Sequence, residues 1–217
     1  AAAGVIDLGS TASARVAVVR SRITRFRGWG IAFLQHQQGL AATADGNVAL
    51  DNTISRISDP AVANGTSEAG IWSGGTNARL VGNRISRTGW DGIETIGSST
   101  GTSIAGNVVR HVPTAVYLEH ATNGARVERN RLEDVDRGVN VEWTYGGVSS
   151  DGNAFVGNTV VRARRVGIFI DVGDDGNTVE GNRFRLGRGV PGIVLQGSSR
   201  NVVRGNVRCG AGDVARE

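Results

Sequence analysis

The chain has 217 residues with 33 Gly and only 3 Pro, and 39% of its residues are hydrophobic. Its formal charge is +4, and all 24 basic residues are Arg spread along the chain, which is too diffuse for a nucleic-acid-binding patch. No run approaches the ~18 apolar residues of a membrane-spanning helix, and the single cysteine, Cys209, excludes an internal disulfide.

The start of the chain is predicted to lie partway through a coil of a repeating structure. Residues 4–8 (Gly-Val-Ile-Asp-Leu) match a segment near the end of the chain, Gly192-Ile-Val-Leu195. The chain begins Ala-Ala-Ala-Gly and contains no Met, which is typical of a processed or trimmed start. We therefore expect a secreted or periplasmic protein.

An asparagine then recurs at intervals of 23 to 31 residues, with Ser21 in its place in the first coil. Asn suits the left-handed backbone of a tight turn, and stacked Asn side chains can form a hydrogen-bonded ladder at the ~4.8 Å spacing of neighbouring strands. These residues are predicted to be structural: Asn52, Asn83, Asn107, Asn130, Asn158, Asn182 and Asn206.

Apolar residues flank the asparagine in nearly every coil, three before it and two after it. A third segment in each repeat opens with Gly or Ala followed by a β-branched residue, at Ile31, Ile71, Ile93, Val116, Val139, Ile168 and Ile193. The pattern predicts an all-β fold, a single-stranded right-handed parallel β-helix of about eight coils with three short strands each. We expect one domain over residues 1–217.

Two coils are longer than the others, with insertions at 58–69 and 144–151 that flank the third strand. Insertions in solenoids collect on the face that binds a ligand. Neither end of the sequence has an amphipathic capping helix, so we expect the chain to be a fragment without its end caps or to be capped by another domain or chain.

If the β-branched opener of the third strand points inward, the first and third residues after it point outward. The third position then places Glu119, Glu142 and Asp171 in a column on successive coils, with His120 and Trp143 one position further. The first position places aromatic and polar residues beside that column: Trp72, Glu94, Tyr117, Asn140 and Phe169.

Aromatic rings beside carboxylates suit a sugar chain, because pyranose faces stack on rings and acids bind hydroxyls or transfer protons. We therefore predict catalytic roles for Glu119, Glu142, Asp171, His120 and Tyr117. Substrate-binding roles are predicted for Trp72, Glu94, Asn140, Trp143 and Phe169. Adjacent carboxylates ~5 Å apart would suit a retaining glycosidase, and proton abstraction by His120 or Tyr117 would suit a lyase.

Three stacked carboxylates repel one another and need a compensating partner. Glu119, Glu142 and Asp171 could supply oxygen ligands to Ca²⁺; otherwise no cofactor is expected. The simpler alternative is that the three acids are solvated or paired with nearby arginines.

The repeated Gly-Asn-x-Ile/Val followed by Gly-Ile-x-Ile resembles the right-handed parallel β-helix repeats of the pectate lyase-like superfamily, over essentially the whole chain. The resemblance implies that the third-strand surface is the groove in which such enzymes bind extended, usually acidic, glycans. The Asp-Pro-His-Asp motif of its mannuronan epimerases is missing, the nearest string being Ser58-Asp59-Pro60-Ala61, and there is no Lys for a lysine-dependent lyase.

The predicted function is therefore a carbohydrate-active protein that binds and cleaves a polysaccharide, with acidic glycans among the candidates, as a polysaccharide lyase or glycoside hydrolase. The alternative is a non-catalytic β-helix module that binds a glycan or a partner protein.

Overall fold

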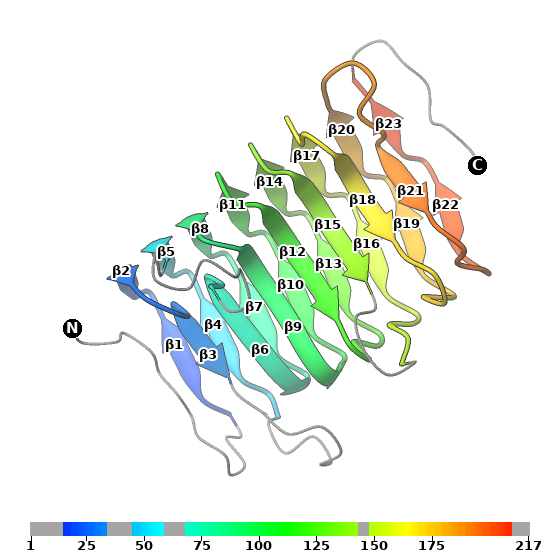
Figure 1. The fold of residues 1–217 in the computed structure, drawn as a ribbon. Coiled ribbons are helices and arrows are strands. Elements are labelled where there is room, and N and C mark those ends of the chain that lie inside the picture. Colours follow the sequence, from blue (N-terminus) through cyan, green and yellow to red (C-terminus); the bar gives the residue numbers. More distant parts are fainter. Residues whose placement is uncertain (1–14, 34–44, 59–67, 143–147, 210–217) are drawn as a thin grey trace.

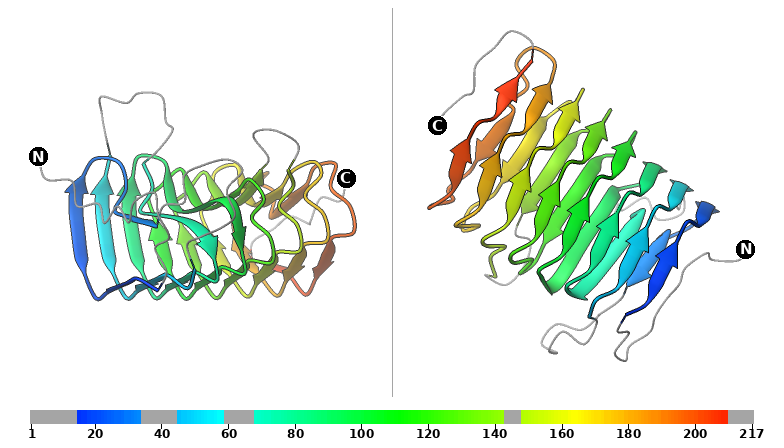
Figure 2. Two further views of the ribbon diagram at one scale, coloured as in Figure 1. Left: turned by 90° about the horizontal axis from the view of Figure 1, so that it is seen from below. Right: turned by 180° about the vertical axis from the view of Figure 1, so that it is seen from behind.

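The computed structural model describes residues 15–33, 45–58, 68–142 and 148–209, and the chain in these ranges forms a β-helix (Figure 1). Its strands belong to three parallel sheets of eight, eight and seven strands. Each coil contributes one strand to each sheet, except that the last described coil adds none to the third sheet, so neighbours within a sheet come from consecutive coils. Views from below and behind show the coils stacked along one axis (Figure 2). The predicted right-handed parallel β-helix is confirmed.

The strands of the first sheet come just before the repeated asparagine in the sequence. It contains β1 (Ala17–Val19), β4 (Val48–Leu50), β7 (Arg79–Val81), β10 (Ser103–Ala105), β13 (Arg126–Glu128), β16 (Ala154–Val156), β19 (Thr178–Glu180) and β22 (Val202–Arg204).

The strands of the second sheet come just after the repeated asparagine in the sequence. It contains β2 (Arg22–Phe26), β5 (Thr53–Ile57), β8 (Arg84–Thr88), β11 (Val108–Arg110), β14 (Arg131–Glu133), β17 (Thr159–Val161), β20 (Arg183–Arg185) and β23 (Val207–Arg208).

The third sheet carries the predicted site. It contains β3 (Ile31–Phe33), β6 (Ile71–Thr76), β9 (Asp91–Thr100), β12 (Thr114–Glu119), β15 (Arg137–Glu142), β18 (Val166–Ile170) and β21 (Ile193–Leu195). No helix occurs in the described residues, and hence none that could cross a membrane.

The core is a column of mainly aliphatic side chains from all three sheets, and Leu80, Ile104 and Leu118 are fully buried within it, as are Phe33 and Phe155. The β-branched openers of the third sheet, such as Ile93 and Val116, are also fully buried. Burial of such side chains stabilises the fold by about 1.5–3 kcal/mol each.

The predicted asparagine ladder is present. Asn83 donates from its Nδ2 to Oδ1 of Asn107 at 3.0 Å, and Asn107 donates in the same way to Asn130. The same contact repeats from Asn52 to Asn206. Each Asn also donates to a backbone carbonyl of the preceding coil, as Asn107 does to Leu80 at 2.8 Å.

The backbone reason given for these asparagines needs correction. The left-handed conformation belongs to the residue before each Asn, such as Asp51 with φ of 54° and Gly82 with φ of 68°. The asparagines themselves are needed because their buried side chains satisfy backbone N–H groups at the corner, as Asn107 Oδ1 does for Asn83 N–H.

The Gly or Ala that precedes each β-branched opener of the third sheet faces the core, where consecutive coils approach closely. A Cβ atom at Gly92 would lie 2.3 Å from Cγ1 of Val109 and 2.6 Å from the carbonyl oxygen of Ala115. Because Gly92 faces the core and side chains alternate along a strand, the residue before Gly92, Asp91 in β9, lies on the outer face. The start of each third strand therefore adds a row to that face.

Candidate functional site

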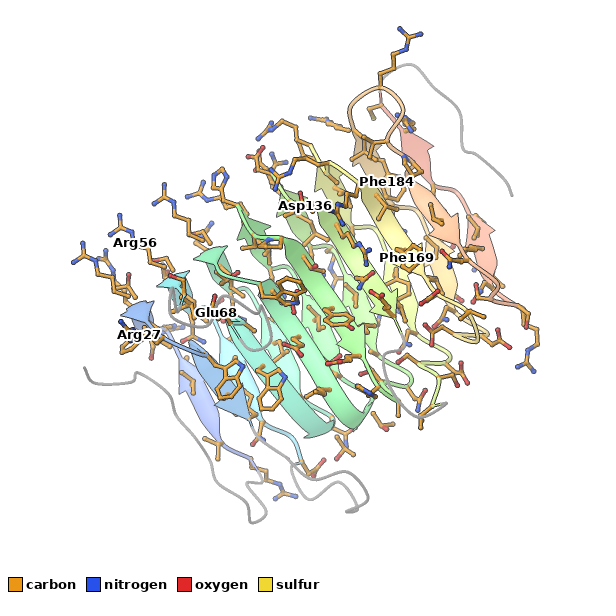
Figure 3. The ribbon with its side chains drawn as sticks, viewed as in Figure 1. Arg27, Arg56, Glu68, Asp136, Phe169 and Phe184 are labelled. Carbon is orange, nitrogen blue, oxygen red and sulfur yellow. The ribbon has the colours of Figure 1, made fainter. Side chains whose placement is uncertain are left out.

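The outer row predicted on the third sheet is in register. Tyr117 pairs with Glu94 on one side and Asn140 on the other, and the row continues to Trp72 and Phe169. Glu119 pairs with Glu142 in the second row. Asp171 follows Ile170, which is paired with Val141, and therefore continues that row. Phe169 is labelled on this face in Figure 3.

The exposure of this row differs from the prediction. Trp72, Glu94 and Tyr117 are only 7%, 8% and 8% exposed, and Asn140 is 3% exposed. Long side chains at the ~4.8 Å spacing between strands cover one another, so an outward direction does not give a solvent-exposed side chain. Phe169, Glu119, Glu142 and Asp171 are half-buried.

A stacked tryptophan pair forms one end of this face. The rings of Trp29 and Trp72 are 4.8 Å apart at an interplanar angle of 7°. They pack with Ala32 and Ala69 in a small apolar cluster that is separate from the main core. A flat, partly covered aromatic surface therefore lies beside the acids.

Three carboxyl groups cluster next to the tryptophans. Glu94 is hydrogen-bonded to Glu119 on the next coil and to the indole of Trp72 on the preceding coil. Burial, together with the charges of Asp91 and Glu119, raises the pKa of Glu94 to about 10. Glu94 therefore holds a proton at neutral pH and donates the hydrogen bond to Glu119.

Asp91 is the most deeply buried of the three and is fully enclosed. Burial raises its pKa well above the usual range, the hydroxyl of Thr114 opposes that rise, and the charge of Glu119 adds to it. Neither carboxyl oxygen of Asp91 has a well-formed hydrogen bond within the described residues. A buried carboxyl without such bonds is costly and often marks a functional position.

His120 continues the hydrogen-bonded chain from Glu119. Its Nδ1 lies 3.2 Å from Oε1 of Glu119, and the two side chains are 20% and 14% exposed. The sequence Trp72, Glu94, Glu119, His120 therefore links three consecutive coils. Carboxyl groups held in different protonation states beside an imidazole are able to donate and accept protons.

Glu142 belongs to a different group on the next coil. Arg137 donates from Nη1 to Oδ1 of Asn140 at 2.8 Å and to Oε2 of Glu142 at 2.9 Å. Asn140 also donates to Oε2 of Glu142 at 2.8 Å. The guanidinium of Arg137 lies 5.3 Å from the ring centre of Phe169. Glu142 is thus neutralised by an arginine.

Asp171 has a third environment. Its Oδ1 accepts the N–H of Val172 at 2.8 Å. Its charge also contributes, after burial, to the raised pKa of Asp174, which is about 6. The three aligned acids therefore have three different sets of partners.

The predicted calcium site has no support in the side-chain geometry. No group of three or more His, Cys, Asp or Glu side chains in the described ranges is arranged to hold a metal ion. Calcium binding by Glu119, Glu142 and Asp171 stays a prediction. Trp143, the remaining predicted binding residue, lies outside the described residues.

Sequence reasoning missed Asp91 and Arg137. Both lie two positions before the β-branched opener and pair with Thr114 in register, which forms an additional outer row. The sequence feature that could have found them is the small residue that lies between each of them and the β-branched opener. Because that small residue faces the core, the residue before it lies on the outer face.

A family model described as "Periplasmic copper-binding protein (NosD)" matches residues 76–213. A comparison with curated proteins gave no match.

Two solved structures share the fold. The periplasmic alginate epimerase AlgG is 13% identical, with a TM-score of 0.55 over 87% of this chain and 50% of that chain. The catalytic unit of a thermostable GH87 alpha-1,3-glucanase from Streptomyces thermodiastaticus strain HF3-3 is 14% identical, with a TM-score of 0.56 over 91% of this chain and 44% of that one. This chain thus spans about half of each protein, and the likeness at such identities shows the fold alone.

Proposed function

This chain belongs to the NosD family, and we propose that it binds a polysaccharide along the outer face of its third sheet and acts on it by proton transfer. The observation that carries the proposal is the chain of contacts from Trp72 through Glu94 and Glu119 to His120. It places a protonated carboxyl, a second carboxyl and an imidazole beside an aromatic stack.

The copper-binding description of the family does not fit the donor groups in the part of the chain that the structure describes. Copper sites use Cys, Met and His ligands, but the chain has no Met and its one Cys, Cys209, is exposed. His36 lies outside the described residues, His111 is paired with Asp134 at 3.7 Å, and His120 with Glu119. No step of the proposed function uses copper.

Glycan binding is supported by the side chains along this face. The Trp29–Trp72 pair and Phe169 offer ring surfaces, while Asn140 and Glu142 offer polar groups that Arg137 holds in place. Pyranose rings stack on aromatic rings and present hydroxyls to polar groups at the side. The two structural neighbours are named for action on alginate and on an α-1,3-glucan.

Proton transfer is supported by the difference between protonated Glu94 and the neighbouring carboxyl group of Glu119. In a hydrolase, protonated Glu94 would donate to the glycosidic oxygen, and Glu119, which is hydrogen-bonded to Glu94, would have to move to the ~5 Å or larger separation at which a second carboxylate acts. In a lyase, Glu119 or His120 would remove a proton next to a uronate carboxylate, with Tyr117 as the alternative base. Glu142 and Asp171 on the following coils would then contact sugar units farther along the face, and with Glu119 they would be the oxygen ligands of a calcium ion.

An extracytoplasmic location is part of the proposal. The family description and the name of the epimerase both include the word periplasmic. A secreted or periplasmic protein would meet polysaccharides of the cell envelope or its surroundings.

The second candidate is a non-catalytic glycan-binding or partner-binding module. The observation that favours it is the burial of Glu94 and Tyr117, each 8% exposed, which restricts access to the acids.

Incubation of the purified chain with neutral and uronate polysaccharides separates the candidates. An increase in reducing ends alone would indicate a hydrolase, and unsaturated ends with ultraviolet absorbance would indicate a lyase. Binding of a polysaccharide with no change in its chain by the wild type would favour the module.

A further inference from the structure

Three arginines form a column on the second sheet, away from the face that carries the acids. Arg25, Arg56 and Arg87 lie near the ends of β2, β5 and β8, and the residues on either side of each pair in register with those of the next coil. All three are exposed, and Arg56 points away from the ribbon in Figure 3. This arginine column therefore follows the axis of the β-helix, with one residue per coil at the ~4.8 Å spacing of neighbouring strands.

Further along the same line the charges are paired within the chain. The next three coils place His111, Asp134 and Arg162 there. His111 lies 3.7 Å from Asp134, and Arg162 donates to Asp134 at 2.6 Å. The arginine column has no such ion pair within the described residues. Like charges directly opposite each other on neighbouring strands are destabilising, and an anionic ligand would offset that repulsion.

The surface beside the arginine column is basic and rich in hydroxyl groups. The strands β2, β5, β8 and β11 contain six arginines and no Asp or Glu. Thr24, Ser55 and Ser86 pair in register next to the column, and the hydroxyls of Thr24 and Ser55 lie 3.2 Å apart. Arg22 and Arg84 are exposed on the other side of this hydroxyl row. Cationic groups therefore flank a row of hydroxyls that can bind sugar hydroxyls.

We propose that this surface binds an acidic polysaccharide that runs along the axis of the β-helix, with successive carboxylates on Arg25, Arg56 and Arg87. A guanidinium binds a carboxylate through two parallel hydrogen bonds. The surface belongs to the second sheet, whereas the proposed action on a polysaccharide takes place on the third. The inference therefore goes beyond the proposed function and does not depend on turnover.

Other polyanions fit this surface less well. Single-stranded nucleic acids stack their bases on aromatic rings, and the one aromatic residue of these four strands, Phe26, packs against the core. Double-stranded DNA has one charge per ~1.7 Å of its axis, about three times the density of this column. Lipid surfaces bind apolar side chains together with basic ones, and the exposed large hydrophobic residues of the described ranges lie outside these strands.

The test is calorimetric titration of the chain with a galacturonate oligomer and with its methyl-esterified form of equal length. We expect the acid to bind about tenfold tighter than the ester, because exposed ion pairs are individually weak but three of them act on one ligand. The affinity for the acid should fall as the salt concentration rises, because salt screens exposed charges. The affinity for the ester should change little.

A variant that combines Arg25→Gln, Arg56→Gln and Arg87→Gln locates the binding. It should bind the acid about tenfold more weakly than the wild type and should no longer distinguish the acid from the ester. The three side chains are exposed, so the variant should fold, and an unchanged melting temperature checks this.

The matched control combines Arg129→Gln, Arg162→Gln and Arg200→Gln. These arginines also have a left-handed backbone, with φ of 52°, 53° and 57°, and the control removes the same total charge. Each of them is paired with an acid of the chain, so the control should bind the acid as the wild type does.

Equal affinity for the acid and the ester, or equal loss of affinity in the two triple variants, would overturn this inference. Tighter binding of a single-stranded oligonucleotide or of vesicles with anionic lipids than of the galacturonate oligomer would also overturn it. These outcomes leave the proposed function standing, because that proposal is tested by turnover on the third sheet.

Discussion

Glu94 of β9 and Glu119 of β12 are joined by a carboxyl–carboxyl hydrogen bond across two consecutive coils. Two ionised carboxylates cannot form that bond, so the folded chain keeps a proton on this pair of side chains. The bound proton affects the stability of the protein as well as the chemistry of the site.

The stability of the protein should fall as pH rises. The pKa of Glu94 is about 10 in the folded chain against an ordinary value of 4.5, so between these values the folded state binds one more proton than the unfolded state. The unfolding free energy then decreases with pH, by at most about 1.4 kcal/mol per unit for one group. Denaturant unfolding at several pH values between about 5 and 8 measures this slope.

Glu94→Gln should reduce that dependence, because the amide cannot lose a proton, and the raised pKa of Asp91 accounts for the part that remains. The variant should also be more stable than the wild type at the upper end of the range. A variant with the same slope as the wild type would show that Glu94 titrates normally.

Removal of one rung from the asparagine ladder should destabilise the fold. Asn107 accepts hydrogen bonds from the backbone N–H and the side chain of Asn83, and it is 1% exposed. Asn107→Ala leaves buried donors unsatisfied, and we expect a loss of about 3 kcal/mol. Asn206→Ala is the matched control in the last coil, where Asn206 is half-buried and water can replace it; a loss of about 1 kcal/mol is expected. Equal losses would contradict the role of burial.

A methyl group at Gly92 should destabilise the protein through overpacking. Its Cβ would lie 2.6 Å from a backbone oxygen of the next coil, which cannot move without disturbing the sheet. We expect Gly92→Ala to lower the unfolding free energy by about 2 kcal/mol. Gly187→Ala, where the nearest atom is 4.0 Å away, should have little effect. Thermal melting compares the two variants.

Calcium should leave the melting temperature unchanged. Glu142 is held by Arg137 and Asn140, Glu119 faces His120, and Asp171 accepts its neighbour's N–H. Calcium would have to displace these partners. A rise in melting temperature that disappears in Glu142→Gln would instead establish the calcium site predicted from the sequence.

The fold could be predicted from the sequence because its rules are local and repeat in every coil. The β-branched opener, the corner asparagine and the apolar residues around it each recur at one place in the coil, and register follows from that recurrence. The alignment of Glu119 with Glu142 was predictable for the same reason.

The candidate site was less predictable because partners depend on side-chain reach between coils. The sequence aligned Glu119, Glu142 and Asp171 as equals, but Arg137 two positions before one strand opener neutralises only Glu142. Burial of Glu94 depends on the tryptophan next to it, which alternation alone does not show.

Turnover by Glu119→Gln tests the central claim most directly. Glu119 links protonated Glu94 to His120, so the wild type should cleave or modify a polysaccharide that it binds, and Glu119→Gln should bind the same polysaccharide without turnover. Unchanged turnover in this variant, or binding without any turnover by the wild type across neutral, uronate and amino polysaccharides, would contradict the account.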